Sequence, residues 1–257
     1  MSEHGAIDGI AAWAFSSLML GLRIAPVFSL APPFSMTRVP ATFRALFGLA
    51  MAGCLVAGQP AGALITEFDL SHLVVTALRE LFLGGVFVMA FQVMFGALYV
   101  AGRTIDIQAG FGLALLIDPT SRAQTPLVGT LFAYAAGAVF FALNGHIDLL
   151  RMMAATLDAV PIGTGGPPAS LGRLTTFISA VFAVSFGVGG GAILCLFLTD
   201  AAIALMSRTV PQMNVLMLGF QVKTLLLLLV LPVSLGVSAA ALARMARITL
   251  EAVPGLL

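Results

Sequence analysis

The chain has 257 residues, of which 60% are hydrophobic and only 9% are charged. Soluble proteins carry about 25% charged residues, so this composition excludes an ordinary soluble domain and indicates an integral-membrane protein. The formal net charge of +1 offers no electrostatic basis for binding nucleic acid. The two cysteines, Cys54 and Cys195, lie in apolar runs, where we expect neither a disulfide framework nor a metal site.

Apolar segments follow one another along the chain at about residues 10–30, 43–56, 73–100, 127–143, 174–198 and 215–243. A straight helix needs about 20 residues to span a bilayer, so the second of these six is too short. Glycines and prolines such as Gly84, Gly187 and Pro232 recur inside the others, which predicts short, kinked helices that pack on protein more than on lipid. We therefore expect an all-α fold of the integral-membrane type.

Four ionisable residues, Arg23, Arg79, Glu80 and Lys223, lie within these segments or at the start of one. A charged side chain is costly inside a membrane, so each is a candidate functional residue. The alternative is that they form interhelical pairs that fix helix register, Arg79 with a neighbouring carboxylate and Lys223 with Asp200 or a partner subunit.

The positive charges in the links between segments predict an orientation. Arg38 and Arg44 lie in the first link and Arg208 lies in the fifth, so the positive-inside rule places the first, third and fifth links in the cytoplasm. Arg244 and Arg247 do not fit this pattern. Either the C-terminal stretch turns back, or the chain does not follow a simple series of crossings.

The stretch from Gly102 to Pro126, GRTIDIQAGFGLALLIDPTSRAQTP, separates two apolar segments, and Gly110, Gly112 and Pro119 disfavour a long helix through it. Irregular backbone at membrane depth survives only when it is buried in protein or lines an aqueous cavity. The alternative is an ordinary loop outside the membrane. Against that alternative stands a set of apolar residues that a solvated loop has no reason to carry. They are Phe111, Leu113, Leu115, Leu116 and Ile117.

Catalytic patterns such as a nucleophile elbow, a phosphate loop or a zinc-binding helix do not occur in the sequence, so we predict no catalytic, cofactor or metal site and no enzyme. A secondary transporter of a small solute is a rival function, with Arg23, Glu80 and Lys223 as coupling residues. However, the sequence has no convincing inverted repeat.

Four stretches identify a family. They are RIAPVFSLAPPFSMTRVPATFRALFGLAMA (23–52), the central stretch (102–126), FFALNGHIDLL (140–150) with DAVPIG (158–163), and SRTVPQMNVLMLGFQVK (207–223). The QxGxxxxxxxDP pattern of Gln108, Gly110, Asp118 and Pro119, together with the VPQMN turn, resembles the FliR/SctT family of type III export-gate subunits. The resemblance spans nearly the whole chain. The NGH and PQMN forms are more similar to the flagellar branch than to the injectisome branch.

This resemblance implies a non-enzymatic subunit of a protein-conducting gate, without a cofactor. It implies a FliP-like N-terminal part (1–170) and a FliQ-like C-terminal helical hairpin (171–257). One copy would close a helical ring of FliP-like and FliQ-like subunits, with an FlhB-like subunit at the entrance. The location would be the bacterial inner membrane, in the flagellar basal body, and the cargo would be unfolded flagellar export substrates. An injectisome subunit and the small-solute transporter are the alternatives.

The resemblance also assigns roles to residues. The stretch 109–125 would plug the pore. Leu113 and Leu116 lie near positions at which the family often has aromatic residues. The plug residues are Gln108, Gly110, Phe111, Gly112, Leu113, Leu116, Ile117, Asp118 and Pro119. Arg208, Pro211 and Gln212 would form a turn at the cytoplasmic entrance. Buried charges that support assembly would be Arg23, Arg79, Glu80 and Lys223.

Overall fold

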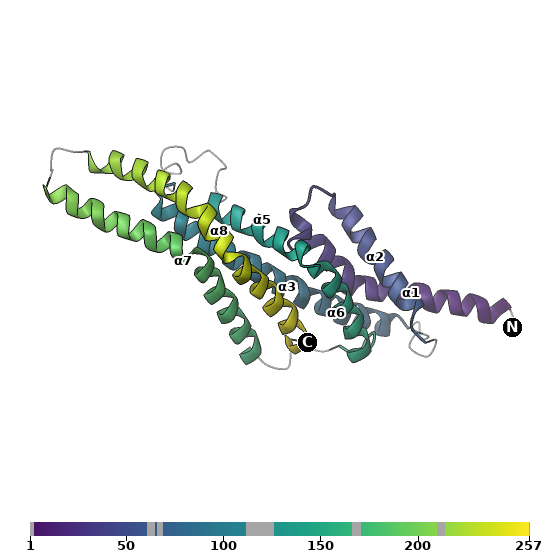
Figure 1. Cartoon of the computed structure of the whole chain (residues 1–257). Helices are drawn as coiled ribbons and strands as arrows, with labels where there is room; N and C mark the ends of the chain where they lie inside the picture. Colours follow the sequence, from purple (N-terminus) through teal and green to yellow (C-terminus); the bar gives the residue numbers. More distant parts are fainter. Residues whose placement is uncertain are drawn as a thin grey trace. The chain divides into compact units, whose positions relative to one another are not determined.

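The computed structural model describes residues 3–60, 65, 69–111, 126–165, 171–209 and 214–256 (Figure 1). Every regular element in these ranges is a helix, which confirms the predicted all-α class. In chain order the elements are α1 (Glu3–Leu30), the 3-10 helix η1 (Phe34–Met36), α2 (Ala41–Ala57), α3 (Leu70–Gln108), α5 (Leu127–Ala142), α6 (Gly145–Ala159), α7 (Leu171–Thr209) and α8 (Val215–Leu256).

Among the described residues, four stretches are long and apolar enough to cross a membrane: Gly9–Leu30, Leu70–Gln108, Gly172–Thr209 and Met217–Pro254. Helices α5 and α6 pass the same test only as a pair, bent by 70°. Helix α2 has 17 residues, in keeping with the prediction that it is too short.

The prediction of short helices is wrong for α3, α7 and α8, which have 39, 39 and 42 residues. Gly187 and the three glycines after Val188 lie inside α7, and Pro232 lies inside α8. In an apolar environment the main chain has no other hydrogen-bond partners, so a helix tolerates such residues.

The chain divides into two compact units, which we describe separately. Unit 1 comprises Met1–Val93, Asn144–Phe177 and Thr249–Leu257, and unit 2 comprises Met94–Leu143 and Ile178–Ile248. Helices α3, α7 and α8 therefore contribute residues to both units.

Unit 1 is built on close contact between α1 and two neighbouring helices. A Cβ atom added at Gly48 of α2 would lie 2.6 Å from the Cα of Ala25, and one added at Gly84 of α3 would lie 2.5 Å from the carbonyl oxygen of Arg23. Both helices thus pack against the main chain of α1. Phe87 and Phe91 of α3 are fully buried and fill the core of this unit.

Unit 2 contains an equally close crossing between α3 and α5. A Cβ atom added at Gly102 would lie 2.2 Å from both the Cα and the nitrogen of Gly129, so main chain meets main chain there. The side chains of Ile105 and Phe132 are fully buried beside this crossing, and both lie close to Gly189 of α7.

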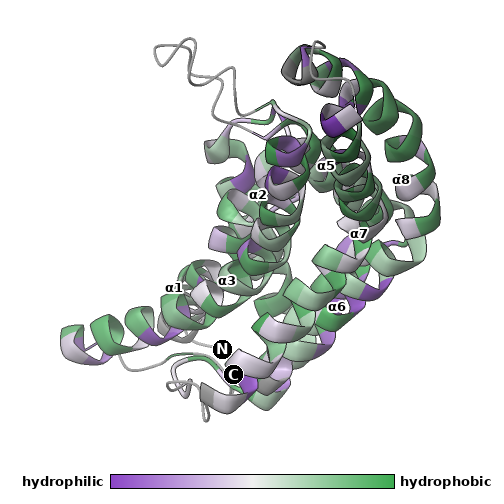
Figure 2. Cartoon of the chain, turned by 90° about the vertical axis from the view of Figure 1, so that its left-hand side faces the viewer, coloured by the Kyte–Doolittle hydropathy of each residue, from purple (hydrophilic) through white to green (hydrophobic). Residues whose placement is uncertain are grey.

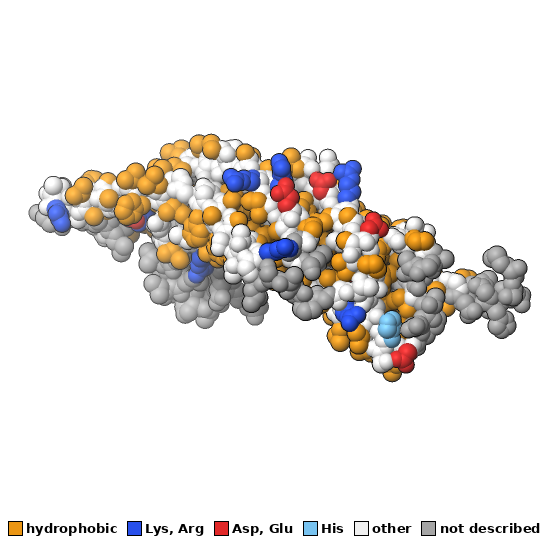
Figure 3. Space-filling view, turned by 90° about the horizontal axis from the view of Figure 1, so that it is seen from below, with side chains coloured by type: hydrophobic (Ala, Val, Ile, Leu, Met, Phe, Trp, Pro, Cys, Tyr) orange, Lys and Arg blue, Asp and Glu red, His pale blue; other side chains and the backbone are white. Residues whose placement is uncertain are grey.

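Helices α7 and α8 form an antiparallel hairpin in unit 2 (Figure 1). The hydroxyl groups of Ser234 and Ser238 on α8 donate hydrogen bonds to the carbonyl of Val188 on α7, at 3.0 and 3.3 Å. Only 33% and 17% of the most apolar windows of α7 and α8 are buried, against 56% for α3. Both helices are coloured hydrophobic along most of their length in Figure 2. Figure 3 likewise shows hydrophobic side chains over much of the face in view. Much of the apolar surface of the hairpin is therefore uncovered within the chain.

Candidate functional site

The C-terminal end of α3 is a Schellman motif. The N–H of Gly110 donates to the carbonyl of Ile107 at 3.1 Å, and the N–H of Phe111 donates to the carbonyl of Asp106 at 3.0 Å. Gly110 has a φ of 89°, a left-handed conformation that glycine adopts without strain. The prediction of irregular backbone from Gly102 onward is therefore wrong for residues 102–108, which are helical. Gly102 does not break the helix, because its missing side chain serves the contact with α5.

Asp106 joins the end of α3 to the start of α5. Its carboxylate oxygens accept hydrogen bonds from the N–H of Val128 at 3.2 and 3.3 Å. Pro126, which precedes α5, makes no side-chain capping bond, so Asp106 supplies the cap from a distance of 22 residues in sequence. This contact ties the end of α3 to the start of α5, the two helices that flank residues 112–125. The sequence analysis did not predict this role, although a helix that begins after proline needs an acceptor from elsewhere in the fold.

Phe111 lies against α8. Its ring meets the ring of Phe220 edge to face, with centroids 6.5 Å apart and an interplanar angle of 71°. A Cβ atom at Gly110 would lie only 3.1 Å from Cδ2 of Phe220, so the absence of a side chain at Gly110 allows this contact. Phe220 was quoted within a family motif but was not predicted as a site residue.

The other predicted plug residues are only partly covered by the structure. Gln108 is the last residue of α3, and its Oε1 atom is buried without a hydrogen-bond partner among the described residues. The remaining ones lie outside the described residues, so their role stays a prediction. They are Gly112, Leu113, Leu116, Ile117, Asp118 and Pro119.

A buried ion pair lies at the centre of unit 1. The guanidinium of Arg23 on α1 donates to the carboxylate of Glu80 on α3 from Nε at 2.7 Å and from Nη2 at 3.0 Å. The side chains are 1% and 0% exposed. Arg23 also donates to the carbonyls of Thr156 and Val160 near the end of α6, and Glu80 accepts the N–H of Gly163 at 2.9 Å. These two charges therefore compensate each other within unit 1.

The other two predicted charges differ from this pair. Arg79 is exposed within the single chain, and its guanidinium donates to the carbonyl of Gly163. Its burial in an assembly and its pairing with a carboxylate stay predictions. The adjacent residue, Glu80, faces α1 instead, because successive helical residues point about 100° apart. Lys223 forms an ion pair with Asp200 across the α7–α8 hairpin, which confirms the predicted pairing.

The predicted cytoplasmic turn is described at its edges. Arg208 lies in the last turn of α7, whereas Pro211 and Gln212 lie outside the described residues. On the other side, Oδ1 of Asn214 accepts a hydrogen bond from the N–H of Met217 at 3.2 Å and so caps the N-terminus of α8.

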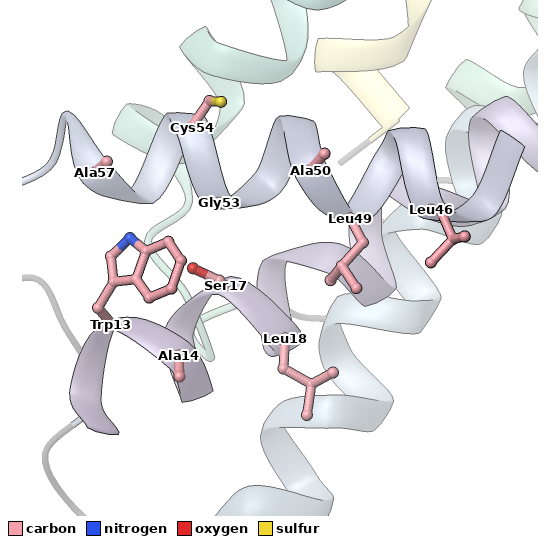
Figure 4. Close-up of a pocket in the computed structure, with 10 residues that line it drawn as sticks. All are labelled: Trp13, Ala14, Ser17, Leu18, Leu46, Leu49, Ala50, Gly53, Cys54 and Ala57. Atoms are coloured by element: carbon pink, nitrogen blue, oxygen red, sulfur yellow. The ribbon is translucent and has the colours of Figure 1, made fainter. Parts of the chain in front are cut away.

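An apolar groove of about 640 Å³ runs between α1 and α2. Figure 4 shows Trp13 and Ser17 of α1 beside Gly53 of α2. The Ser17 hydroxyl is buried and has no hydrogen-bond partner among the described residues. The groove is lined by Trp13, Ala14, Ser17, Leu18, Leu46, Leu49, Ala50, Gly53, Cys54 and Ala57. Among the residues that the structure describes, this lining includes no charged side chain.

Comparisons with known proteins agree with the motifs. The sequence profile of the bacterial export proteins, family 1, matches residues 14–248. The flagellar biosynthetic protein FliR of Bacillus subtilis (strain 168) is 29% identical over 247 residues, which cover 93% of each chain. FliR of Escherichia coli (strain K12) is 26% identical over 77% of this chain and 76% of its own. The Yop proteins translocation protein T of Yersinia pestis is 26% identical over 66% and 64% of the two chains.

Proposed function

This chain belongs to family 1 of the bacterial export proteins, and on that premise we propose that it is a non-enzymatic membrane subunit of a type III protein export gate, of the flagellar branch. The family resemblance inferred from the motifs is confirmed by the profile match over residues 14–248. The relatives include flagellar FliR proteins and also the Yersinia translocation protein T. The flagellar branch is favoured by the 93% coverage and the 29% identity of the Bacillus subtilis relative.

In the proposed assembly, one copy of this chain joins FliP-like and FliQ-like subunits in the bacterial inner membrane, within the flagellar basal body. Its residues 1–170 take the FliP-like place and residues 171–257 the FliQ-like place. The uncovered apolar surface of α7 and α8 supports such an assembly, because a surface of this kind packs on lipid or on other subunits. The partly exposed pair of Lys223 and Asp200 lies on the same hairpin. The turn with Arg208, Pro211 and Gln212 would face the cytoplasm and an FlhB-like subunit.

The proposed role of the segment 109–125 is to plug the pore. An apolar constriction blocks ions by steric filling and by dewetting, which needs no energy input from this subunit. The single observation that supports this proposal is the hydrogen bond from Val128 to Asp106, since it joins the two helices between which the apolar segment lies in the sequence. Unfolded export substrates would pass when the plug moves aside.

Deletion of residues 113–117 tests the plug. This deletion keeps Gly110 and Phe111, and therefore the end of α3. In cells that express all gate subunits, we expect normal assembly, together with a raised ion conductance and raised uptake of a small impermeant dye. Leu116→Asp should leak less than the deletion, because the other apolar residues still narrow the constriction. Leu116→Met, which stays apolar, is the control. A deletion variant that assembles and stays as tight as the intact gate would reject the plug.

A further inference from the structure

The apolar groove between α1 and α2, both in unit 1, has polar groups at one end only. Figure 4 shows Trp13 and Ser17 toward the end where α2 stops at Ala57. Leu18 and Leu46 line the opposite end. We propose that the groove binds one acyl chain of a membrane phospholipid, with the ester group of the lipid beside Trp13 and the hydrocarbon along the leucines. This site goes beyond the proposed function and does not depend on the plug.

Trp13 lies at the level of a membrane interface. The apolar span of α1 is Gly9–Leu30, so Trp13 is four residues, or about 6 Å, from the N-terminal end of this span. Tryptophan is enriched at this level of a bilayer, because its ring is apolar and its N–H needs a polar acceptor. The side chain is 42% exposed, and its N–H makes no hydrogen bond within the described part of the chain. An ester carbonyl of a phospholipid is an acceptor found at this depth.

Ser17 is a second donor, one helical turn from Trp13 on the same face of α1. The residue is only 7% exposed, and its hydroxyl has no hydrogen-bond partner among the described residues. A buried hydroxyl without a partner has lost its bond to water and gained nothing in exchange, so such groups are rare. Figure 4 shows this hydroxyl directed into the space between the two helices, beside the indole ring. A turn of the partly exposed indole opens the hydroxyl to a lipid carbonyl.

The rest of the groove fits hydrocarbon. The helices are in main-chain contact farther along, where a Cβ atom at Gly48 would lie 2.6 Å from the Cα of Ala25, and they leave the groove between them toward Trp13. Its volume of about 640 Å³ is in the range of small-molecule sites. The lining changes from hydrogen-bond donors at the interface to leucines farther in, which is the polarity of a lipid. The apolar face of a neighbouring helix would not require this change.

A photoreactive lipid tests the site in the unchanged chain. The complete gate is placed in vesicles of phosphatidylethanolamine and phosphatidylglycerol, with a trace of phosphatidylethanolamine that carries a diazirine midway along one acyl chain. After illumination, mass spectrometry compares labelling at Leu49, which lines the groove, with labelling at Phe43, which does not. Random contact with lipid follows exposure and favours Phe43, which is 65% exposed against 37% for Leu49. We expect more labelling at Leu49. Labelling of Leu49 that is equal to that of Phe43, or lower, would overturn the proposal.

Variants test the two parts of the groove. Ala50→Phe places a ring in the lining and should abolish the excess labelling at Leu49 without changing that at Phe43. Ala41→Phe adds the same ring at an exposed position of α2 outside the groove and is the matched control. An Ala50→Phe gate that keeps the excess, or an Ala41→Phe gate that loses it equally, would overturn the proposal.

The donors are tested by substitutions that barely change shape. Ser17→Ala and Trp13→Phe each remove one donor, and each should lower labelling at Leu49 about two- to twelvefold, the range for one hydrogen bond. Co-purification with the other subunits verifies that each variant assembles. Unchanged labelling in both variants would overturn the proposal, and this result decides if Ala50→Phe does not assemble.

A helix of a neighbouring subunit is the other possible occupant. In the complete gate, Leu18 is replaced by the photoreactive residue p-benzoylphenylalanine, and the captured molecule is identified by mass spectrometry. Capture of a phospholipid supports the proposal, and capture of another gate subunit in its place overturns it. The plug is tested by deletion of residues 113–117, so either proposal can fail without the other.

Discussion

The buried pair in unit 1 gives the sharpest prediction about stability, through the substitution Glu80→Gln. Glutamine has nearly the shape of glutamate, but it loses the charge that compensates Arg23, whose side chain is 1% exposed. Three hydrogen bonds converge on the carboxylate, two from Arg23 and one from Gly163. Removal of one partner from a buried ion pair costs about 3–5 kcal/mol, because the other charge is left buried and uncompensated.

This cost can be measured as a melting temperature. For a chain of about 150–250 residues, each 1 kcal/mol lowers the melting temperature by about 2–4 °C. We therefore expect the purified gate with Glu80→Gln to melt roughly 6–20 °C lower than the unchanged gate. The matched control is Asp148→Asn, which breaks an ion pair with Arg151 whose side chains are 53% and 76% exposed. Exposed pairs contribute about 0–1 kcal/mol, so this control should move the melting temperature by less than about 4 °C.

A double variant tests the physical reason. In Arg23→Met with Glu80→Leu, no uncompensated charge remains, and only the groups that faced the pair lose partners. The double variant should therefore be less destabilised than Glu80→Gln alone. The reasoning is refuted if Glu80→Gln melts within the range of the Asp148→Asn control, or if the double variant is the least stable of all.

Two further predictions concern packing and capping. Gly84→Ala should lower the free energy of unfolding by about 1–3 kcal/mol, because its Cβ would lie 2.5 Å from the carbonyl oxygen of Arg23. Gly85→Ala is the control and should be neutral or slightly stabilising, because its Cβ would have nothing within 4 Å. Equal thermal shifts for the two alanine variants would contradict this. Asp106→Ala should cost about 0.5–2 kcal/mol through loss of the cap on α5, and Asp106→Asn, which keeps an acceptor, should cost less. Limited proteolysis within residues 112–125 should become faster in Asp106→Ala. An unchanged rate of cleavage would show that the hydrogen bond from Val128 to Asp106 does not restrain this segment.

Local features of the sequence were enough for some of these contacts. Asp200 and Lys223 lie at nearly equal distances on either side of the predicted turn at 207–214, so an antiparallel hairpin brings them level. The ion pair of Arg23 and Glu80 could not be predicted in this way, since 57 residues separate the partners. Arg79 and Glu80 are adjacent ionisable residues, and the sequence does not show which of them lies opposite Arg23. Which of them faces α1 depends on the rotation of α3 about its axis, and tertiary packing decides that rotation.

The extent of α3 illustrates a second limit. A glycine in a sequence can end a helix, or it can lie inside a helix where a second helix packs closely. Which of the two applies depends on the residue that packs against the glycine. Gly102 meets Gly129, so the helix continues, whereas Gly110 adopts a positive φ and the helix ends. Phe220 could not be singled out either, because the chain has 19 phenylalanines and no local pattern distinguishes the one that meets Phe111.

The crossing of Gly102 and Gly129 has a mechanical consequence. Side chains between two helices can accommodate a small displacement by changing rotamer. At this crossing the two main chains are in direct contact, and no side chain lies between them to do so. The bond from Val128 to Asp106 lies only four residues beyond Gly102, or about 6 Å along the helix. A pulling force that reaches α5 through residues 112–125 therefore acts on the rigid main-chain contact between Gly102 and Gly129. Helices α3 and α5 would then move together. The strain would spread along α3 instead of remaining where the force is applied.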